Sequence, residues 1–196
     1  DSLSLTILWF CATIGQASEP PLMVGDFFPD FALVQTDGSR WQLSAQAGQP
    51  NIVLFWATWC PYCRKLMPGI VLLHETYSDH GLQVVGVNFR DDGDTVAYAR
   101  KMNIRFNIVL DGDELARRVG VQGTPTVFVL DRAHRIVLRS SDSDPDNPAL
   151  RAAVESVTGL EDAALMDQEH RQLPANHTAR EQQLHPFGPA AGGNFH

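Results

Sequence analysis

The 196-residue sequence is poor in cysteine. It contains three, and only Cys60 and Cys63 are spaced as a C-x-x-C pair. Tetrahedral zinc needs four ligands, yet the sequence has neither a second C-x-x-C pair nor a suitably spaced pair of histidines. We therefore expect no bound metal, and we favour a redox function for the pair over a structural zinc site or an inert disulfide.

The sequence also lacks an excess of positive charge. Its 23 acidic and 15 basic residues give a net charge of -8, which argues against nonspecific nucleic-acid binding and against a polybasic membrane-binding patch. There is no internal repeat. The length and the 44% apolar content suit one globular domain with tails.

No long hydrophobic run is present. Residues 3–14 are uncharged and mostly apolar, but as a helix they would span only about 18 Å of a ~30 Å hydrocarbon core. Gly15-Gln16-Ala17 follows, with the small residues that signal peptidases prefer. We expect residues 1–17 to be part of a secretory signal that is cleaved after Ala17, which would remove Cys11. A retained N-terminal membrane anchor is the alternative, and it requires further residues upstream.

Beyond this segment, the apolar pattern alternates between strands and helices. Asp37-Gly38 is a hairpin signal between residues 31–34 and 40–43. Continuous apolar runs at residues 51–56 and 82–89 are typical of strands buried on both faces. The pattern further predicts an extended segment at residues 106–110 and a second hairpin at 126–130 and 135–139. Helices are predicted at residues 60–77 and 94–102, and a third helix is predicted from a capping box at 111–114 through residue 119. A last helix is predicted to begin at residue 147 or 148 and to continue beyond 157, as far as about 171.

The paired cysteines stand where the helix at residues 60–77 begins. Disulfide exchange needs one thiolate that attacks and a second thiol that resolves the mixed disulfide. Backbone N–H groups and the helix dipole favour negative charge on Cys60, whereas Cys63 lies one turn further in and is expected to be more buried. Pro61 suits an early helical position because its missing N–H would have no helical partner there. We predict that Cys60 attacks and Cys63 resolves.

A second motif, Gly123-Thr124-Pro125-Thr126, precedes the strand at residues 126–130. A cis Thr124–Pro125 bond would place the backbone of Thr124 beside Cys60, where an extended substrate chain could pair with it. We predict that this bond is cis. His74 is expected to contribute packing rather than chemistry. The residues predicted to contact substrate are Trp59, Pro61, Tyr62, Thr124 and Pro125.

Residues 55–64, Phe-Trp-Ala-Thr-Trp-Cys-Pro-Tyr-Cys-Arg, closely resemble the active-site segment of thioredoxins. Val24-Gly25-Asp26, Pro29-Asp30-Phe31 and residues 123–131 resemble the exported TlpA/ResA/CcmG-like thiol–disulfide oxidoreductases, relatives of the AhpC/TSA-Redoxin superfamily. The resemblance covers residues 24–157.

The resemblance and the element order predict an α/β thioredoxin fold, in which helices flank a central mixed sheet, with an extra N-terminal β-hairpin. We expect a lead-in at residues 18–23 and the domain at 24–171. Residues 172–196 lack apolar periodicity and are expected to form a disordered tail.

The resemblance implies an extracytoplasmic enzyme that exchanges thiols and disulfides with protein substrates and needs no cofactor besides a Cys60–Cys63 disulfide. It implies a periplasmic reductase, kept reduced by a membrane electron donor, for cytochrome c maturation or metal-centre assembly. A disulfide oxidase remains an alternative because sequence does not set the redox potential. A copper metallochaperone is an alternative of another class, since thiolates select Cu(I); His134 or a Met would then have to lie near the cysteines.

Two positions depart from the family pattern. Leu54 stands where thioredoxins carry a buried Asp, and Leu66 stands where ResA-type proteins commonly carry a Glu. Both acids are thought to help move the proton of the buried thiol. This chain must therefore use another group, water or a slower route, and the sequence does not name that group.

Overall fold

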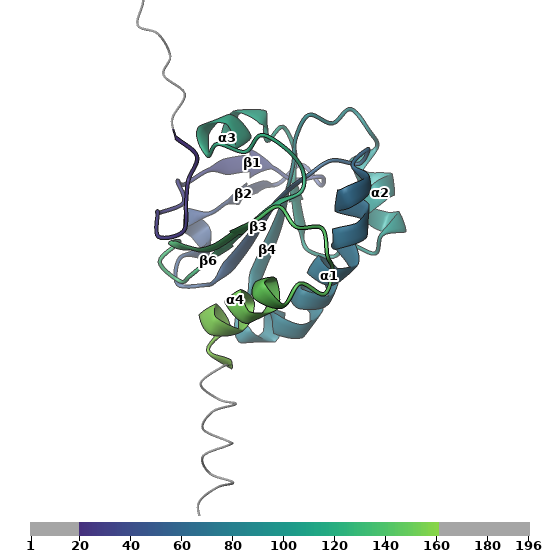
Figure 1. The fold of residues 1–196 in the computed structure, drawn as a ribbon. Helices are drawn as coiled ribbons and strands as arrows, with labels where there is room; N and C mark the ends of the chain where they lie inside the picture. The colour runs from purple at the N-terminus through teal and green to yellow at the C-terminus, as the bar shows by residue number, and fades with distance from the viewer. Residues whose placement is uncertain (1–19, 161–196) are drawn as a thin grey trace, which may run out of the picture.

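The computed structural model describes residues 20–160 (Figure 1). The expected signal segment, the tail and the continuation of the last helix towards residue 171 lie outside this range. Within residues 20–160, no helix is both long and apolar enough to cross a membrane.

A five-stranded mixed sheet forms the centre of the domain, in the order β5-β4-β3-β6-β7. The central strand β3 pairs in parallel with β4 and antiparallel with β6, the first strand of the second predicted hairpin. A separate antiparallel pair, β1 and β2, forms the predicted N-terminal hairpin. The strands are β1 (Ala32–Val34), β2 (Arg40–Gln42), β3 (Asn51–Trp56), β4 (Gln83–Asn88), β5 (Asn107–Val109), β6 (Thr126–Leu130) and β7 (Ile136–Ser140).

Helices lie on both faces of this sheet (Figure 1). The long helix α1 follows β3 directly, and α4 packs near it on the same face. The helices are α1 (Pro61–Tyr77), α2 (Thr95–Lys101), α3 (Asp113–Arg118) and α4 (Pro148–Thr158), with 3-10 turns at Ser44–Gln46 and Ser78–His80. These elements confirm the predicted thioredoxin fold.

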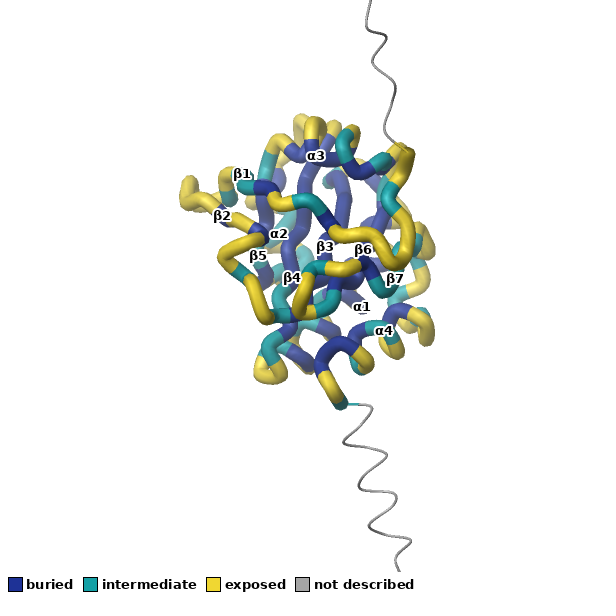
Figure 2. Tube along the Cα trace, turned by 90° about the vertical axis from the view of Figure 1, so that its left-hand side faces the viewer, coloured by how far each residue is buried: buried dark blue, intermediate teal, exposed yellow. Residues whose placement is uncertain are grey.

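Strand β3 separates two apolar cores because its side chains alternate between the faces of the sheet. Ile52, Leu54 and Trp56 pack with α1 and α4, whereas Val53 and Phe55 pack with the N-terminal hairpin and α3. Figure 2 shows the central strands buried and the exposed positions gathered on the outer turns. The cysteine pair belongs to the first core, which also contains Leu66 and Met67 of α1.

The prediction of a capping box at residues 111–114 is wrong. Helix α3 begins after Gly112, and no side chain caps it. A Cβ atom at Gly112 would lie 2.3 Å from a side-chain carbon of Val87 and 3.0 Å from the carbonyl oxygen of Asn88. The turn therefore approaches β4 too closely for a capping side chain at this position. At the other end of the domain, α4 ends at Thr158, where Gly159 adopts a left-handed conformation.

Candidate active site

The cysteine pair lies at the junction of β3 and α1. Cys60 is the N-cap of α1, and the backbone N–H of Cys63 donates to its Sγ atom at 3.1 Å. Pro61 occupies the first turn, where a missing N–H costs no helical hydrogen bond. This end of the helix presents N–H groups to the Cys60 sulfur and would stabilise negative charge on it.

The predicted proline loop packs against this sulfur. The Thr124–Pro125 peptide bond is cis, as predicted. The Cys60 thiol donates to the carbonyl oxygen of Thr124 at 3.6 Å, although 64 residues separate them in sequence. Thr126 holds the loop in place, because its Oγ1 donates to the carbonyl oxygen of Gly123 at 2.9 Å. The fold thus brings the two sequence motifs together.

Both cysteines are free thiols, and both are buried. The expectation that Cys63 is more buried was wrong for the residues as a whole, since each is only 1% exposed. Cys60 is covered because its sulfur lies against the Thr124 backbone. Burial, together with the hydrogen bond and charge of neighbouring Cys60, raises the pKa of Cys63 to about 12. The Ala57 backbone and the Thr124 side chain offset only part of this rise, so Cys63 is a protonated thiol at neutral pH.

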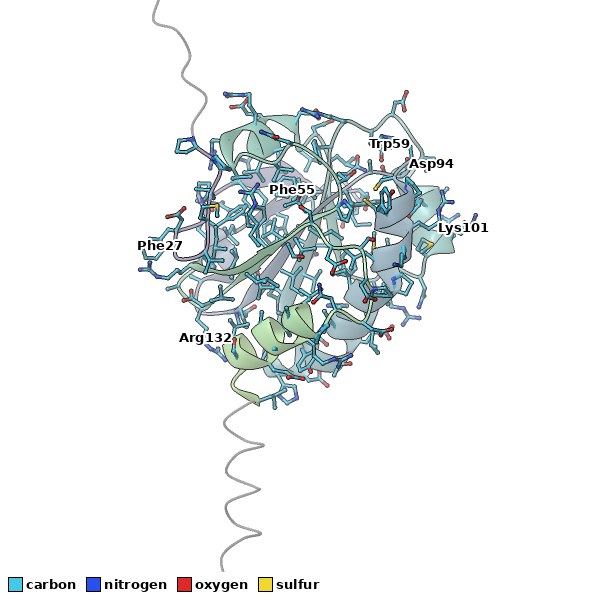
Figure 3. All side chains as sticks on the ribbon, viewed as in Figure 1. Phe27, Phe55, Trp59, Asp94, Lys101 and Arg132 are labelled. Atoms are coloured by element: carbon cyan, nitrogen blue, oxygen red, sulfur yellow. The ribbon has the colours of Figure 1, made fainter. Side chains whose placement is uncertain are left out.

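Two exposed aromatic residues flank the pair. Trp59 is 58% exposed and Tyr62 is 63% exposed, which is unusual for side chains of this size. The Trp59 indole is nevertheless held in place, because Nε1 donates to the carbonyl oxygen of Arg90 at 2.8 Å. Figure 3 shows Trp59 at the end of α1 where the cysteines lie. Both rings are therefore accessible from outside, and their contact with a substrate stays a prediction.

A groove of about 680 Å³ runs from Tyr62 along the proline loop. Arg139 shapes one wall, since its guanidinium donates to the carbonyl oxygens of Leu22 (2.6 Å) and Gly120 (2.9 Å). The N-terminal lead-in, which the sequence presented only as a connecting segment, therefore forms part of the candidate site. The lining includes Pro21, Met23, Tyr62, Thr124, Pro125 and Ser141.

A hydrogen-bonded brace that the sequence analysis missed holds the other side of the active-site loop. Asp91, which follows β4, accepts from the backbone N–H (2.7 Å) and the hydroxyl (2.6 Å) of Thr58. It also accepts from the side chain of Asn88 at 2.5 Å and from the N–H of Gly93 at 3.0 Å. An acidic residue three positions after the end of a buried strand was the available signal, because polar side chains there meet at the edge of the sheet.

The brace leaves no room for a side chain at Gly93. A Cβ atom there would lie 2.1 Å from Oγ1 of Thr58. The segment that begins α2 therefore packs directly on the loop that carries Cys60, and Figure 3 shows Asp94, the N-cap of α2, near Trp59.

The histidines considered from the sequence lie away from the paired sulfurs. His74 is half-buried three turns along α1, with its ring 5.9 Å from that of Phe106, and burial lowers its pKa. His134 lies in the turn between β6 and β7, where its N–H donates to Asp131. Within residues 20–160, no group of three His, Cys, Asp or Glu side chains is arranged to hold a metal ion.

The fold and the paired thiols define a thioredoxin-fold dithiol protein. The family model for AhpC/TSA matches residues 24–139, more than half of the chain, and the chain belongs to this family. It is similar to the thioredoxin-like protein YneN of Bacillus subtilis, with 32% identity over 58% of this chain and 68% of the relative. It is also similar to the thiol–disulfide oxidoreductase ResA of Geobacillus thermodenitrificans, with 30% identity over 58% of this chain and 66% of the relative.

Solved structures agree with this assignment. A crystal structure of a candidate thiol:disulfide interchange protein DsbE from Chlorobium tepidum is 32% identical and matches with a TM-score of 0.65, covering 70% of this chain and 99% of that chain. The predicted TlpA/ResA/CcmG-like membership is confirmed. The protein is a thiol–disulfide oxidoreductase that catalyses thiol–disulfide exchange.

Proposed function

We propose that this protein reduces disulfides in protein substrates, with Cys60 as the attacking thiol and Cys63 as the resolving thiol. The observation that carries the proposal is the difference between the two sulfurs. Cys60 accepts an N–H at the start of α1 and touches the proline loop, whereas the raised pKa of Cys63 keeps it protonated. Only a thiolate attacks efficiently, so Cys60 is the better first nucleophile.

The exchange proceeds in two steps. The Cys60 thiolate attacks one sulfur of a substrate disulfide, which forms a Cys60–substrate disulfide and releases the other substrate sulfur as a thiolate. Cys63 then loses its proton to solvent and attacks Cys60. The Cys60–Cys63 disulfide forms and the second substrate sulfur leaves as a thiolate, which takes a proton from solvent. The substrate gains two electrons and the enzyme loses two.

The environment of Cys63 is compatible with the reductase direction. A strong oxidant such as DsbA owes its high potential to a stabilised reduced form. Here burial disfavours a thiolate at Cys63, so the reduced form gains no such stabilisation from this residue. Trp59, Pro61, Tyr62, Thr124 and Pro125 would contact the substrate, with an extended segment of it lying along the groove beside Tyr62 and the proline loop.

We place this activity outside the cytoplasm, where the sequence suggests a secretory signal or an N-terminal anchor. A reductase there needs a source of electrons, so we propose a membrane thiol–disulfide donor that returns the Cys60–Cys63 disulfide to the dithiol. Cytochrome c maturation or metal-centre assembly is the expected purpose, because both need protein cysteines in the reduced form before they bind haem or metal.

The redox potential tests the direction of exchange. Equilibration with glutathione or dithiothreitol buffers should give a potential closer to the value of about -270 mV for thioredoxin than to about -120 mV for DsbA. A potential near the DsbA value would instead identify an oxidase.

On the same sample, a Cu(I) titration tests the metallochaperone alternative. Tight copper binding that Cys60→Ala abolishes, in a chain without reductase activity, would favour the metallochaperone.

A further inference from the structure

The positions where related proteins carry an acid near the buried thiol are apolar in this protein. Leu54 of β3 and Leu66 of α1 are both buried in the same core as Cys60 and Cys63. Neither side chain can hydrogen-bond to a sulfur. The thiol of Cys63 must still lose its proton before it resolves a mixed disulfide, so a polar group elsewhere in this core would matter.

Tyr98 of α2 brings such a group into the core. Its ring packs on Trp56 with 5.1 Å between centroids, and it lies against the cluster that contains both cysteines. The hydroxyl is buried, and its proton has no acceptor within residues 20–160. The guanidinium of Arg64 lies close enough to hydrogen-bond to the hydroxyl oxygen, which lowers the pKa of Tyr98. A tyrosine hydroxyl can accept one hydrogen bond and donate another, so the proton of Tyr98 remains available to a thiolate that forms during the reaction.

The packing of α2 explains why the hydroxyl is held there. Asp94 caps the helix through the N–H of Ala97, and the preceding Gly93 is in close contact with Thr58 of the active-site loop. The N–H of Tyr98 donates to the carbonyl oxygen of Asp94, one turn away. The start of α2 is thus fixed against the loop that carries Cys60, with Tyr98 one turn further along.

We propose that the Tyr98 hydroxyl acts as the hydrogen-bond donor that stabilises the Cys63 thiolate when it forms, in the role left open by Leu54 and Leu66. Tyr98 keeps its proton throughout and donates it only as a hydrogen bond. The thiol proton itself passes to solvent, the Cys63–Cys60 bond forms, and the Cys60–substrate bond breaks. The inference rests on Cys63 as the resolving thiol.

The titration properties of Tyr98 suit a donor. Burial raises the pKa of Tyr98, and negative charge on Cys63 or Cys60 raises it further, while the guanidinium of Arg64 lowers it in part. The hydroxyl therefore stays protonated while a thiolate is present. Cys60 is the titratable group that acts on the Cys63 thiol, and the Ala57 backbone and the Thr124 side chain hydrogen-bond to this thiol. Charge on Cys63, on Cys60 and on the exposed Arg64 in turn acts on Tyr98. The hydrogen bonds from the Ala57 backbone and the Thr124 side chain leave the pKa of Cys63 raised to about 12, so a further donor would help when the thiolate forms.

The test measures the ionisation of Cys63 in a Cys60→Ser variant. The 13Cβ chemical shift of Cys63 is recorded from pH 6 to 11, and its midpoint gives the pKa of the thiol. Removing the Cys60 thiol removes two of the causes that raise the pKa of Cys63, which brings its titration into a measurable range. Tyr98→Phe deletes only the hydroxyl and should move the midpoint up by about one unit, because hydrogen bonds to charged groups are worth about that much. An unchanged midpoint would overturn the proposal.

Tyr77→Phe is the matched control, since its hydroxyl donates to Glu155 of α4, on the side of the fold away from the cysteines. It should leave the Cys63 midpoint unchanged, and an equal shift in both variants would overturn the proposal.

A second measurement needs no change at Tyr98. The 13Cζ resonance of Tyr98 should change with the same midpoint as Cys63, and a Tyr98 signal that ignores Cys63 ionisation would contradict the contact.

Kinetics supply a further reading in the chain with both cysteines. A rise of about one pKa unit reduces the thiolate fraction tenfold, while the more basic thiolate is about threefold more nucleophilic. Tyr98→Phe should therefore slow resolution of a preformed Cys60 mixed disulfide about threefold, and leave the rate of its formation unchanged. Because the ionisation measurement needs no turnover, it can fail while the assigned roles of the cysteines stand, and the reverse also holds.

Discussion

The two sides of Cys60 are built in opposite ways. On one side, Thr58, Asn88, Asp91 and Gly93 are joined by four short hydrogen bonds that leave no space between α2 and the active-site loop. On the other side, the lead-in and the proline loop border an open groove beside the exposed ring of Tyr62. The difference suggests that one side positions the sulfur and the other receives the partner.

This contrast gives each side its own measurable property. Changes in the brace should appear in the free energy of unfolding and in every kinetic step that uses Cys60. Changes in the groove should appear in substrate binding, with little effect on stability, because exposed side chains contribute little to folding.

The largest effect is expected from Asp91→Ala. It removes the shared acceptor of the brace and leaves the N–H and hydroxyl of Thr58 and the amide of Asn88 without their partner. Unsatisfied buried groups of this kind cost about 1–3 kcal/mol each and are not additive, so we expect a total loss of about 2–3 kcal/mol. Urea unfolding followed by tryptophan fluorescence measures it.

Asp92→Ala is the control for this change, because Asp92 is the adjacent acid and is exposed. It should change the free energy of unfolding by less than about 0.5 kcal/mol. Equal losses in the two variants would show that the brace has no special part in stability.

The groove side is tested by Tyr62→Ala. Loss of an exposed aromatic contact worth about 1.4 kcal/mol should raise KM for a protein disulfide about tenfold, with kcat nearly unchanged. Leu72→Ala is the control, since Leu72 is also exposed on α1 but lies further along the helix. A fall in kcat without a rise in KM would mean that Tyr62 acts on the chemistry and not on binding.

A smaller effect is expected from pH. Burial alone would raise the pKa of Asp91, but hydrogen bonds from the hydroxyl and N–H of Thr58, from Asn88 and from Gly93 outweigh it and hold the pKa below the usual 3.8. The stabilisation by this carboxylate is thus complete above the unfolded-state pKa and is lost as the pH falls through the lowered value. Between pH 5 and 3, the wild-type free energy of unfolding should decline more steeply than that of Asp91→Asn. Parallel curves would contradict a charged role.

The smallest effect is expected from trimming the chain to residues 18–171. Residues 1–17 are expected to be removed with the signal, and the C-terminal tail lacks the apolar spacing needed to bury a face. Both the fold and the reduction of insulin disulfides should therefore be retained. Loss of exchange would show that the domain boundary is wrong. A tenfold loss of Cu(I) affinity with exchange intact would instead assign a metal-binding role to the tail.

The parts that could be predicted from sequence have local signals. The apolar run of β3, the Asp37-Gly38 turn and the start of α1 at Pro61 each follow from neighbouring residues. The Thr124–Pro125 loop was recognisable because its motif directly precedes β6.

The parts that were missed depend on residues far apart in the chain. Thr58 and Asp91 are separated by 33 positions, and Arg139 reaches Leu22 across 117. No periodicity or spacing reports such pairs. The failed capping box at α3 has the same origin, because the close approach of Gly112 to β4 overrides the local preference of the Asp and Glu residues.

The division of labour between the cysteines is tested most directly by trapping the mixed disulfide. Each single alanine variant is incubated with a disulfide-bonded substrate, quenched with acid, and measured by intact mass. We predict that Cys63→Ala accumulates a covalent Cys60–substrate adduct, because attack survives and resolution does not. Cys60→Ala should give no adduct and no exchange. An adduct on Cys63 in the Cys60→Ala variant, formed as fast as that on Cys60, would contradict the account.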